Sequence, residues 1–221
     1  MLAFCVLYYI SNNYGEKDEC TSSEMTNEAT DTSVEEIRRV AITFDDGPHR
    51  IYTEELLDGL RERNVVATFF VVGVNIEENK ELLQRMKDEG HLIGNHTYSH
   101  VELSKLEPIK QEEEIVRTNQ IIKDITGENV EYIRPPFGSY DRNKVKEGML
   151  DGMFVTLWDI DPRDWCIMDK NQVVQNVVNN VEDGDIILLH DIFATSVEAA
   201  LEIIDILQDR GYEFVTVDKL K

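Results

Sequence analysis

The 221-residue sequence contains only three cysteines, and their positions exclude the common structural uses of cysteine. Cys5, Cys20 and Cys166 form no C-x-x-C pair and have no other metal-type spacing, and an odd count provides no disulfide framework. Cys166 follows a tryptophan, and we expect it to be a small buried residue of the core. The cysteines therefore do not indicate whether the protein works in an oxidising or a reducing compartment.

Basic residues are scarce: 22 Lys and Arg stand against 44 Asp and Glu, for a net charge of −22. Nucleic-acid binding depends on Lys and Arg that neutralise phosphates, and docking on an anionic membrane needs the same residues. We therefore expect neither as a partner. A neutral or cationic substrate, or a metal ion, is more compatible with this surface. No obligate protein partner is evident, and a monomer is expected.

The chain also lacks a hydrophobic run long enough to span a bilayer. The N-terminal MLAFCVLYYI is only ten residues long and has no positively charged n-region. Residues 11–38 are polar, as in a flexible linker. Residues 1–38 thus resemble the end of a signal or anchor followed by an acidic leader, which predicts an extracellular or cell-surface location. The alternative is a disordered tail on a cytoplasmic protein. Residues 39–221 are predicted to form one catalytic domain.

From residue 39 onward, apolar runs alternate with helical patterns, in a chain long enough for one large domain or two small ones. The patterns predict strands at 40–44, 67–72, 92–94, 132–133, 152–157, 185–189 and 214–216, and helices at 53–63, 78–89, 109–126, 144–150, 171–178 and 197–210. This alternation predicts an α/β fold whose parallel sheet closes, or nearly closes, into a single (β/α) barrel of about seven strands.

Polar and titratable residues follow several of the predicted strands. They occur in the segments FDDGP (44–48), NHTYSH (95–100), RPPFG (134–138), WDIDPRDW (158–165) and LLHD (188–191). In α/β barrels the chemistry lies at the C-terminal ends of the strands. These segments are therefore expected to meet on one rim of the barrel.

Two of the five histidines have a spacing that suits a shared metal ion. His96 and His100 are four residues apart, which would place both imidazoles on one face of a helical turn. This spacing alone is weak evidence, because it also occurs by chance. Asp46, at another strand end, completes a His-His-Asp set that leaves positions open for water and substrate, the layout of a catalytic metal site. Zn²⁺ suits these ligands, and Co²⁺ or Mn²⁺ could substitute.

The adjacent acids Asp45 and Asp46 have two interpretations. Asp, Gly and Pro are ordinary turn residues, so the pair could simply end a strand. Alternatively, Asp46 binds the metal, which lowers the pKa of the attacking water, and Asp45 takes the proton as general base. His190 could then donate a proton to the leaving group; otherwise it is a hydrogen-bonded core histidine. A separate base and acid suit attack on a carbonyl with expulsion of an amine.

Five strings of this sequence resemble the ordered motifs of the polysaccharide deacetylases, carbohydrate esterase family 4, which share the NodB homology domain. They are TFDDGP (43–48), HTYSH (96–100), RPPFG (134–138), DPRDW (161–165) and LLH (188–190). The resemblance covers residues 39 to about 217. It implies a distorted α/β barrel and an N-deacetylase activity that depends on a divalent metal. It also implies Asp45 as base, Asp46, His96 and His100 as metal ligands, and His190 as general acid.

The same resemblance implies roles for residues around this centre. Arg134 would orient Asp45 and pair with its charge, and Asp164 would steady Arg134 or its neighbours.

The remaining implied residues would contact the substrate. The backbone N–H of Phe137 would help to hold the tetrahedral oxyanion, in a loop shaped by Pro135 and Pro136. Trp165 and Leu188 would line the pocket for the acetyl methyl group; plain core packing is the alternative for Trp165.

The implied reaction is hydrolysis of the N-acetyl group of N-acetylglucosamine residues in a polysaccharide, with release of acetate. Peptidoglycan is the first candidate, because the leader indicates export. The aromatic Phe137, where some relatives carry a second Arg, favours N-acetylglucosamine over N-acetylmuramic acid. The alternatives are deacetylation of chitooligosaccharides or poly-N-acetylglucosamine, an acetylxylan esterase, a small-molecule amidohydrolase, and a pseudoenzyme that only binds glycan.

Overall fold

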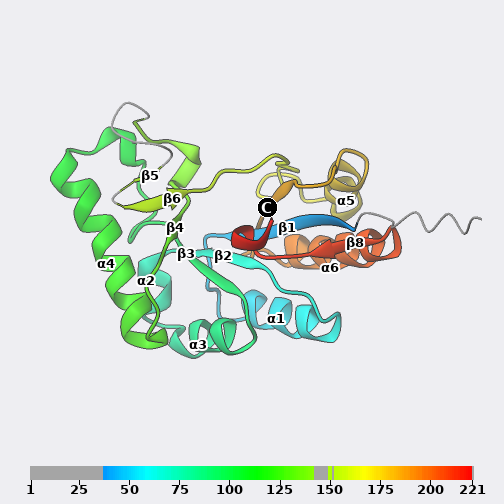
Figure 1. Ribbon diagram of the computed structural model, residues 1–221, viewed down its shortest axis with the longest axis horizontal. Helices are drawn as coiled ribbons and strands as arrows, with labels where there is room; N and C mark the ends of the chain where they lie inside the picture. The colour runs from blue at the N-terminus through cyan, green and yellow to red at the C-terminus, as the bar shows by residue number, and fades with distance from the viewer. Residues whose placement is uncertain (1–36, 142–148, 151, 221) are drawn as a thin grey trace, which may run out of the picture. The chain divides into compact units, whose positions relative to one another are not determined.

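The computed structural model describes residues 37–141, 149–150 and 152–220 (Figure 1). The predicted leader, residues 1–38, lies outside this part except for its last two residues. Within the described residues one sheet has the order β5-β6-β4-β3-β2-β1-β7, with β8 also paired to β1. Its strands are β1 (Arg38–Asp45), β2 (Thr68–Val71), β3 (Leu92–Asn95), β4 (Tyr132–Ile133), β5 (Met149–Leu150), β6 (Met153–Val155), β7 (Ile186–His190) and β8 (Tyr212–Phe214). Every pairing is parallel except that of β5 with β6.

Strand β1 is the centre of the sheet. Its first residues pair with β8, and its last residues pair with β2 and β7. From Val40 to Asp45 every residue is buried, as expected for a parallel strand covered on both faces. The register places Asp45 beside His190 on β7, so the two predicted catalytic groups leave the sheet at the same level.

The sheet curls into a distorted barrel, as predicted, and the chain after β6 joins its two edges. Thr156 still donates a backbone hydrogen bond to Ile133 on β4, at 2.9 Å. Four residues later, Ile160 forms a single parallel bridge with Ile187 on β7. Among the described residues the sheet has eight strands, where about seven were expected. The additional strand is β5: residues 149–150 form a short strand where the end of a helix was expected, and residues 142–148 lie outside the described part.

The helices pack around the sheet in the order α4, α3, α1, α6, α5, each contacting the next (Figure 1). The longer ones match the predicted ranges to within three residues: α1 (Tyr52–Glu62), α3 (Lys80–Asp88), α4 (Pro108–Thr126), α5 (Lys170–Val178) and α6 (Ala194–Asp209). A one-turn helix, α2 (Gly73–Ile76), and 3-10 helices at Leu103–Lys105, Pro136–Gly138 and Val217–Lys219 were not predicted. Apolar stripes such as Leu56, Leu57 and Leu60 of α1 are fully buried in the main core.

Cys166 does not belong to this core. The structure places it in the loop between β6 and α5, exposed and unpaired, so the expectation of a buried cysteine was wrong. None of the described helices is both long and apolar enough to cross a membrane.

Candidate active site

A cavity of about 420 Å³ lies at the C-terminal ends of the central strands. Its lining residues are Asp45, Asp46, His96, His100, Phe137, Trp158, Asp161, Trp165, Leu188 and His190. Every site residue predicted from the sequence lines this cavity except Arg134, Pro135 and Asp164. Trp158 and Asp161 were not predicted as site residues, although both lie within the polar segment that follows β6. The segments at the strand ends therefore meet at one rim of the barrel, as predicted.

The turn after β1 is held from several directions. Asp46 has a left-handed backbone conformation, with φ of 75°, which is unfavourable for a residue other than glycine. Each carbonyl group from Asp45 to Pro48 accepts a hydrogen bond from elsewhere in the fold. The donors, in order, are the backbone N–H of Asp191, the side-chain amide of Asn75, the backbone N–H of Val72 and the side-chain amide of Asn79. Four hydrogen bonds from distant elements thus hold a strained backbone in place. An ordinary turn at the end of a strand would not need them.

The segment from His96 to His100 is not helical, which corrects the basis on which the two histidines were paired. Thr97 and His100 have left-handed φ values of 65° and 55°, so the chain turns back within five residues. The two imidazole rings still come together, with centroids 5.1 Å apart. The spacing identified the right pair of side chains, but a tight turn brings them together.

Asp46, His96 and His100 form a cluster that fits a metal ion. One ligand atom from each residue lies within 4.8 Å of the other two. Oδ1 of Asp46 is 3.1 Å from Nε2 of His100 and 3.4 Å from Nε2 of His96. This oxygen is buried and has no well-oriented hydrogen bond. A buried acceptor facing two ring nitrogens is the arrangement that a cation would satisfy, and these donors suit Zn²⁺ and similar ions.

The surroundings of the cluster also prepare it for a cation. Nδ1 of His96 lies 2.6 Å from the carbonyl oxygen of Arg134, so this nitrogen must carry the proton and Nε2 keeps its lone pair. Burial alone would raise the pKa of Asp46, but its contacts with His100 and His96 outweigh burial and hold this pKa well below its usual range. The carboxylate is therefore charged at neutral pH.

Asp45 lies beside this cluster and is held by Arg134. Nη1 of Arg134 donates to Oδ1 of Asp45 at 2.8 Å, while Oδ2 of Asp45 is 3.7 Å from Nε2 of His96. The guanidinium is fully buried, with Phe70 under its plane. Its other hydrogen bonds go to the Thr43 hydroxyl and to the backbone carbonyls of Thr156 and Leu157. A buried cation with four hydrogen bonds thus fixes the orientation of the Asp45 side chain.

His190 is held by Asp164, and this pairing was not predicted. Oδ1 of Asp164 lies 2.9 Å from Nδ1 of His190, and Oδ2 accepts the backbone N–H of His190 at 2.8 Å. Asp164 therefore steadies His190; the expectation was that it would steady Arg134 or its neighbours. Burial would lower the pKa of His190, but the hydrogen bond and charge of Asp164, helped by Asp45 and Asp46, raise it to about 9. The imidazole is protonated at neutral pH.

The remaining predicted residues shape the mouth and wall of the cavity. Phe137 has a left-handed φ of 59° between the buried Pro136 and Gly138, and its ring stands edge-on to His100. The backbone N–H of Phe137 is not used by another described residue. Pro135, also buried, begins this loop. Trp165 is 49% exposed, which excludes plain core packing, whereas Leu188 is buried behind the cavity.

The fold and the site together place the protein among α/β-barrel hydrolases with a site for a divalent metal. More specifically, a family model described as polysaccharide deacetylase matches residues 33–153, and the chain belongs to this family.

Similar proteins carry several named activities. The peptidoglycan-N-acetylmuramic acid deacetylase PdaC of Bacillus subtilis is 41% identical over 82% of this chain, and its solved structure has a TM-score of 0.79 over 83% of this chain and 89% of that one. A peptidoglycan-N-acetylglucosamine deacetylase of Bacillus cereus is 36% identical over 82% of this chain and 67% of its own length. A chitooligosaccharide deacetylase of a Bradyrhizobium species is 31% identical over the whole of both chains. The chain spans only 38% of the length of PdaC.

Proposed function

We propose that the protein hydrolyses the N-acetyl group of N-acetylglucosamine residues in peptidoglycan, releasing acetate and leaving a free amine. The main support for this proposal is the arrangement, around one cavity, of a three-ligand cluster, a carboxylate held by a buried arginine and a protonated imidazole. The family membership supports deacetylation, and the peptidoglycan deacetylases among the similar proteins support the polymer.

Asp46, His96 and His100 would hold the metal ion, for which we propose Zn²⁺. A divalent ion bound there polarises the acetyl carbonyl and the attacking water. The chain itself contributes the convergent ligand atoms, the fixed tautomer of His96 and the charged state of Asp46. Because three protein ligands leave positions open, substrate and water can reach the ion from the cavity.

We assign proton transfer to Asp45, which Arg134 holds, and to His190, which Asp164 holds. Asp45 accepts a proton from the water as its oxygen attacks the acetyl carbon, and Arg134 keeps that carboxylate oriented throughout. His190, protonated through its contact with Asp164, gives a proton to the amide nitrogen as the carbon–nitrogen bond breaks. The products are acetate and an amine, and the two groups then exchange protons with solvent to restore their starting states.

The cavity wall accounts for recognition of the acetyl group. The backbone N–H of Phe137, which no other described residue uses, is available to the oxygen that becomes negative in the transition state. Leu188 and Trp165 offer apolar surface to the acetyl methyl group. The exposed faces of Phe137 and Trp165 at the mouth suit contact with sugar rings.

The test is acetate release from purified peptidoglycan and from an N-acetylglucosamine oligomer, each with added Zn²⁺ or Co²⁺ and again with chelator. Release that requires the metal supports the deacetylase, and the preferred substrate identifies the polymer. Release from acetylxylan alone would replace the amide substrate with an ester. A bound metal without turnover on any substrate would indicate a glycan-binding pseudoenzyme.

The second candidate is deacetylation of N-acetylmuramic acid, which the 41% identity to PdaC favours. Mass spectrometry of glycan fragments from the treated peptidoglycan separates the two, because only one of the two sugars then lacks its acetyl group. A peptidoglycan substrate also requires the enzyme to work outside the cytoplasm. We therefore propose a cell-surface or extracellular location, with residues 1–38 as part of the export or anchoring segment.

A further inference from the structure

The segment that carries His96 and His100 is held in a conformation that its own residues do not favour. Left-handed backbone costs about 1–2 kcal/mol for a residue other than glycine. Two of the five residues in this turn adopt it, and one of them, Thr97, is β-branched, for which positive φ is rare. The turn contains no glycine that could relieve this cost. It must therefore be stabilised by contacts from another part of the fold.

A single carboxylate on α4 makes three hydrogen bonds to this turn. Oε2 of Glu114 accepts the backbone N–H of Tyr98 at 2.9 Å and that of Ser99 at 2.8 Å. Oε1 of Glu114 accepts the hydroxyl of Ser99 at 2.8 Å. Hydrogen bonds to an ionised acceptor are stronger than those between neutral groups. Tyr98 and Ser99, the two residues that Glu114 contacts, lie between His96 and His100 in the sequence.

The base of the turn is tied to the same helix. Oδ1 of Asn95 accepts the N–H of Thr97 at 2.7 Å, while Nδ2 donates to the carbonyl of Ile115 and to Oδ1 of Asn119. Asn95 is fully buried, so these bonds are shielded from water. Asn95 thus joins the turn to helix α4, and it fixes the position of the turn relative to the carboxylate of Glu114 on that helix.

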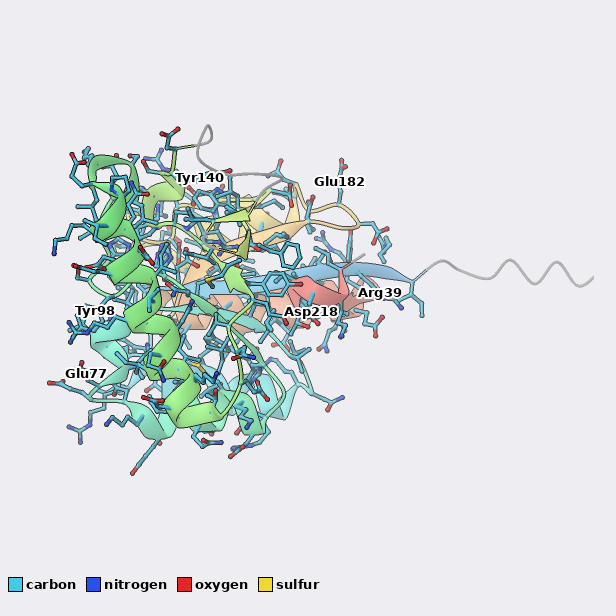
Figure 2. All side chains as sticks on the ribbon, turned by 60° about the vertical axis from the view of Figure 1, so that its left-hand side comes forward. Arg39, Glu77, Tyr98, Tyr140, Glu182 and Asp218 are labelled. Carbon is cyan, nitrogen blue, oxygen red and sulfur yellow. The ribbon has the colours of Figure 1, made fainter. Side chains whose placement is uncertain are left out.

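A third contact reaches the turn from its outer side. The ring of Tyr98 lies under the guanidinium of Arg117 on α4, and its hydroxyl donates to Glu77 at 3.0 Å. Figure 2 shows Tyr98 and Glu77 on the same side, next to α4. These partners are exposed and so contribute little. The carboxylate of Glu114 is therefore the main side-chain support of Tyr98 and Ser99, as Asn95 is of Thr97.

We infer that Glu114 is a positioning residue for the metal site: by holding the turn at Tyr98 and Ser99, it sets the separation of the His96 and His100 imidazoles and hence the affinity for metal. This inference rests on the proposed function in taking these histidines as metal ligands. None of the five motifs contains Glu114, which lies in the middle of α4. It acts on the ligands through the backbone that carries them.

Two variants separate position from charge. Glu114→Gln keeps the reach of the side chain: its carbonyl oxygen can accept both N–H groups and its amide can donate to Ser99. Glu114→Asp keeps the charge but is one methylene too short. Metal affinity is measured on the full chain with Zn²⁺ and Co²⁺, by competition with a chromophoric chelator, and the absorption spectrum of bound Co²⁺ reports the ligand geometry. Glu114→Ala removes both properties.

We expect Glu114→Ala and Glu114→Asp to weaken metal binding by about 10- to 100-fold, the usual effect of losing a group that orients a ligand, and to change the Co²⁺ spectrum. Glu114→Gln should stay close to the wild type in both measurements. Glu113→Ala removes an exposed charge one residue away and should change neither. Gln111→Ala, on the same helix as Glu114, removes a partly buried hydrogen bond to the carbonyl of Leu106 and should lower stability without weakening metal binding.

Wild-type affinity in both Glu114→Ala and Glu114→Asp would overturn the inference while leaving the proposed function intact. Equal weakening in Glu114→Gln and Glu114→Ala, with normal binding in Glu114→Asp, would replace positioning by a charge effect and would also overturn it. A wild-type protein that neither binds metal nor releases acetate would refute the proposed function itself. That outcome would remove the basis of the inference as well.

Discussion

The carbonyl oxygen of Arg134 contacts Nδ1 of His96 at 2.6 Å, while the guanidinium of the same Arg134 donates to Asp45 at 2.8 Å. One buried residue thus orients a proposed metal ligand through its backbone and the proposed base through its side chain. The two functions can be separated, because a substitution changes the side chain and leaves the carbonyl in place.

We predict that Arg134→Lys keeps the metal and loses most of the activity. A lysine retains a buried positive charge but cannot make the four directed hydrogen bonds of the guanidinium, so Asp45 loses its orientation. A misplaced catalytic group costs about 100-fold in rate. Metal content after dialysis and kcat on the same sample test this. Loss of metal in parallel with activity would contradict the separation of the two functions.

Asp45→Asn is expected to bind metal and to lose activity by about 100- to 10,000-fold, since it removes the base and spares all three ligands. Asp46→Asn is its matched partner: it makes the same chemical change one residue along and should lose the metal. Metal analysis and acetate release on both variants decide the matter. Retention of metal by Asp46→Asn would reverse the division of work between the two acids.

The pair of His190 and Asp164 predicts a pH dependence with a defined sign. The general acid must be protonated, so activity should fall as pH rises through the pKa of His190, which is about 9 with Asp164 in place. Asp164→Asn removes the charge that raises this pKa, so the loss of activity should move to lower pH. NMR titration of the imidazole in the metal-free protein measures the same shift without turnover. An unchanged titration in Asp164→Asn would exclude this role for Asp164.

The fold was largely predictable because its signals are local. Buried parallel strands such as β1 read as continuous apolar runs, and the long helices show their apolar stripes directly. Most of the site residues could be predicted because they follow strands in the sequence, and in an α/β barrel the strand ends meet at one rim. The cluster of Asp46, His96 and His100 could therefore be found from residues far apart in sequence.

The conformation of the site could not be predicted, because it depends on partners from distant elements. A spacing of four residues fits a helical turn as well as a tight turn, and partners such as Asn95 and Glu114 select the second. The partner of Asp164 depends on where the loop after β6 crosses to β7. Phe137 adopts a left-handed backbone conformation although it is not a glycine, so the sequence does not indicate it. Cys166 was wrongly predicted to be buried because only its aromatic neighbour was considered.

The buried His91 predicts a loss of stability in acid. Burial lowers its pKa from 6.5 to about 4, so the folded state keeps the imidazole neutral while the unfolded chain takes up a proton. The contribution of this group is therefore full above about pH 6.5 and declines as pH falls toward 4, by a total on the order of 3 kcal/mol.

His91→Asn tests this, since the Asn oxygen can still accept the N–H of Ala67 that Nδ1 accepts now. The unfolding free energy of this variant should depend less on pH between 6.5 and 4 than that of the wild type. His49→Asn, the same change at a half-buried site, is the control. Parallel pH curves for His91→Asn and the wild type would contradict the assignment.

Gly47, between the metal-ligand turn and Asp191, offers a test of how that turn is fixed. A methyl group added at Gly47 would overlap the fully buried carboxylate of Asp191, which also accepts the hydroxyl of Thr53. Gly47→Ala should therefore cost about 1–3 kcal/mol of stability and weaken metal binding, because Asp46 moves with its neighbour.

If the cause is this contact, Asp191→Ala should make room for the methyl group, and the two substitutions should not be additive. The double variant should then recover part of the stability lost by Gly47→Ala, with a coupling of about 0.5–3 kcal/mol. Denaturant unfolding of the four proteins gives the coupling, and metal affinity on the same set shows whether Asp46 returns to its place. Additive losses in both measurements would mean that Gly47 is needed for the backbone of the turn and that Asp191 takes no part in setting it.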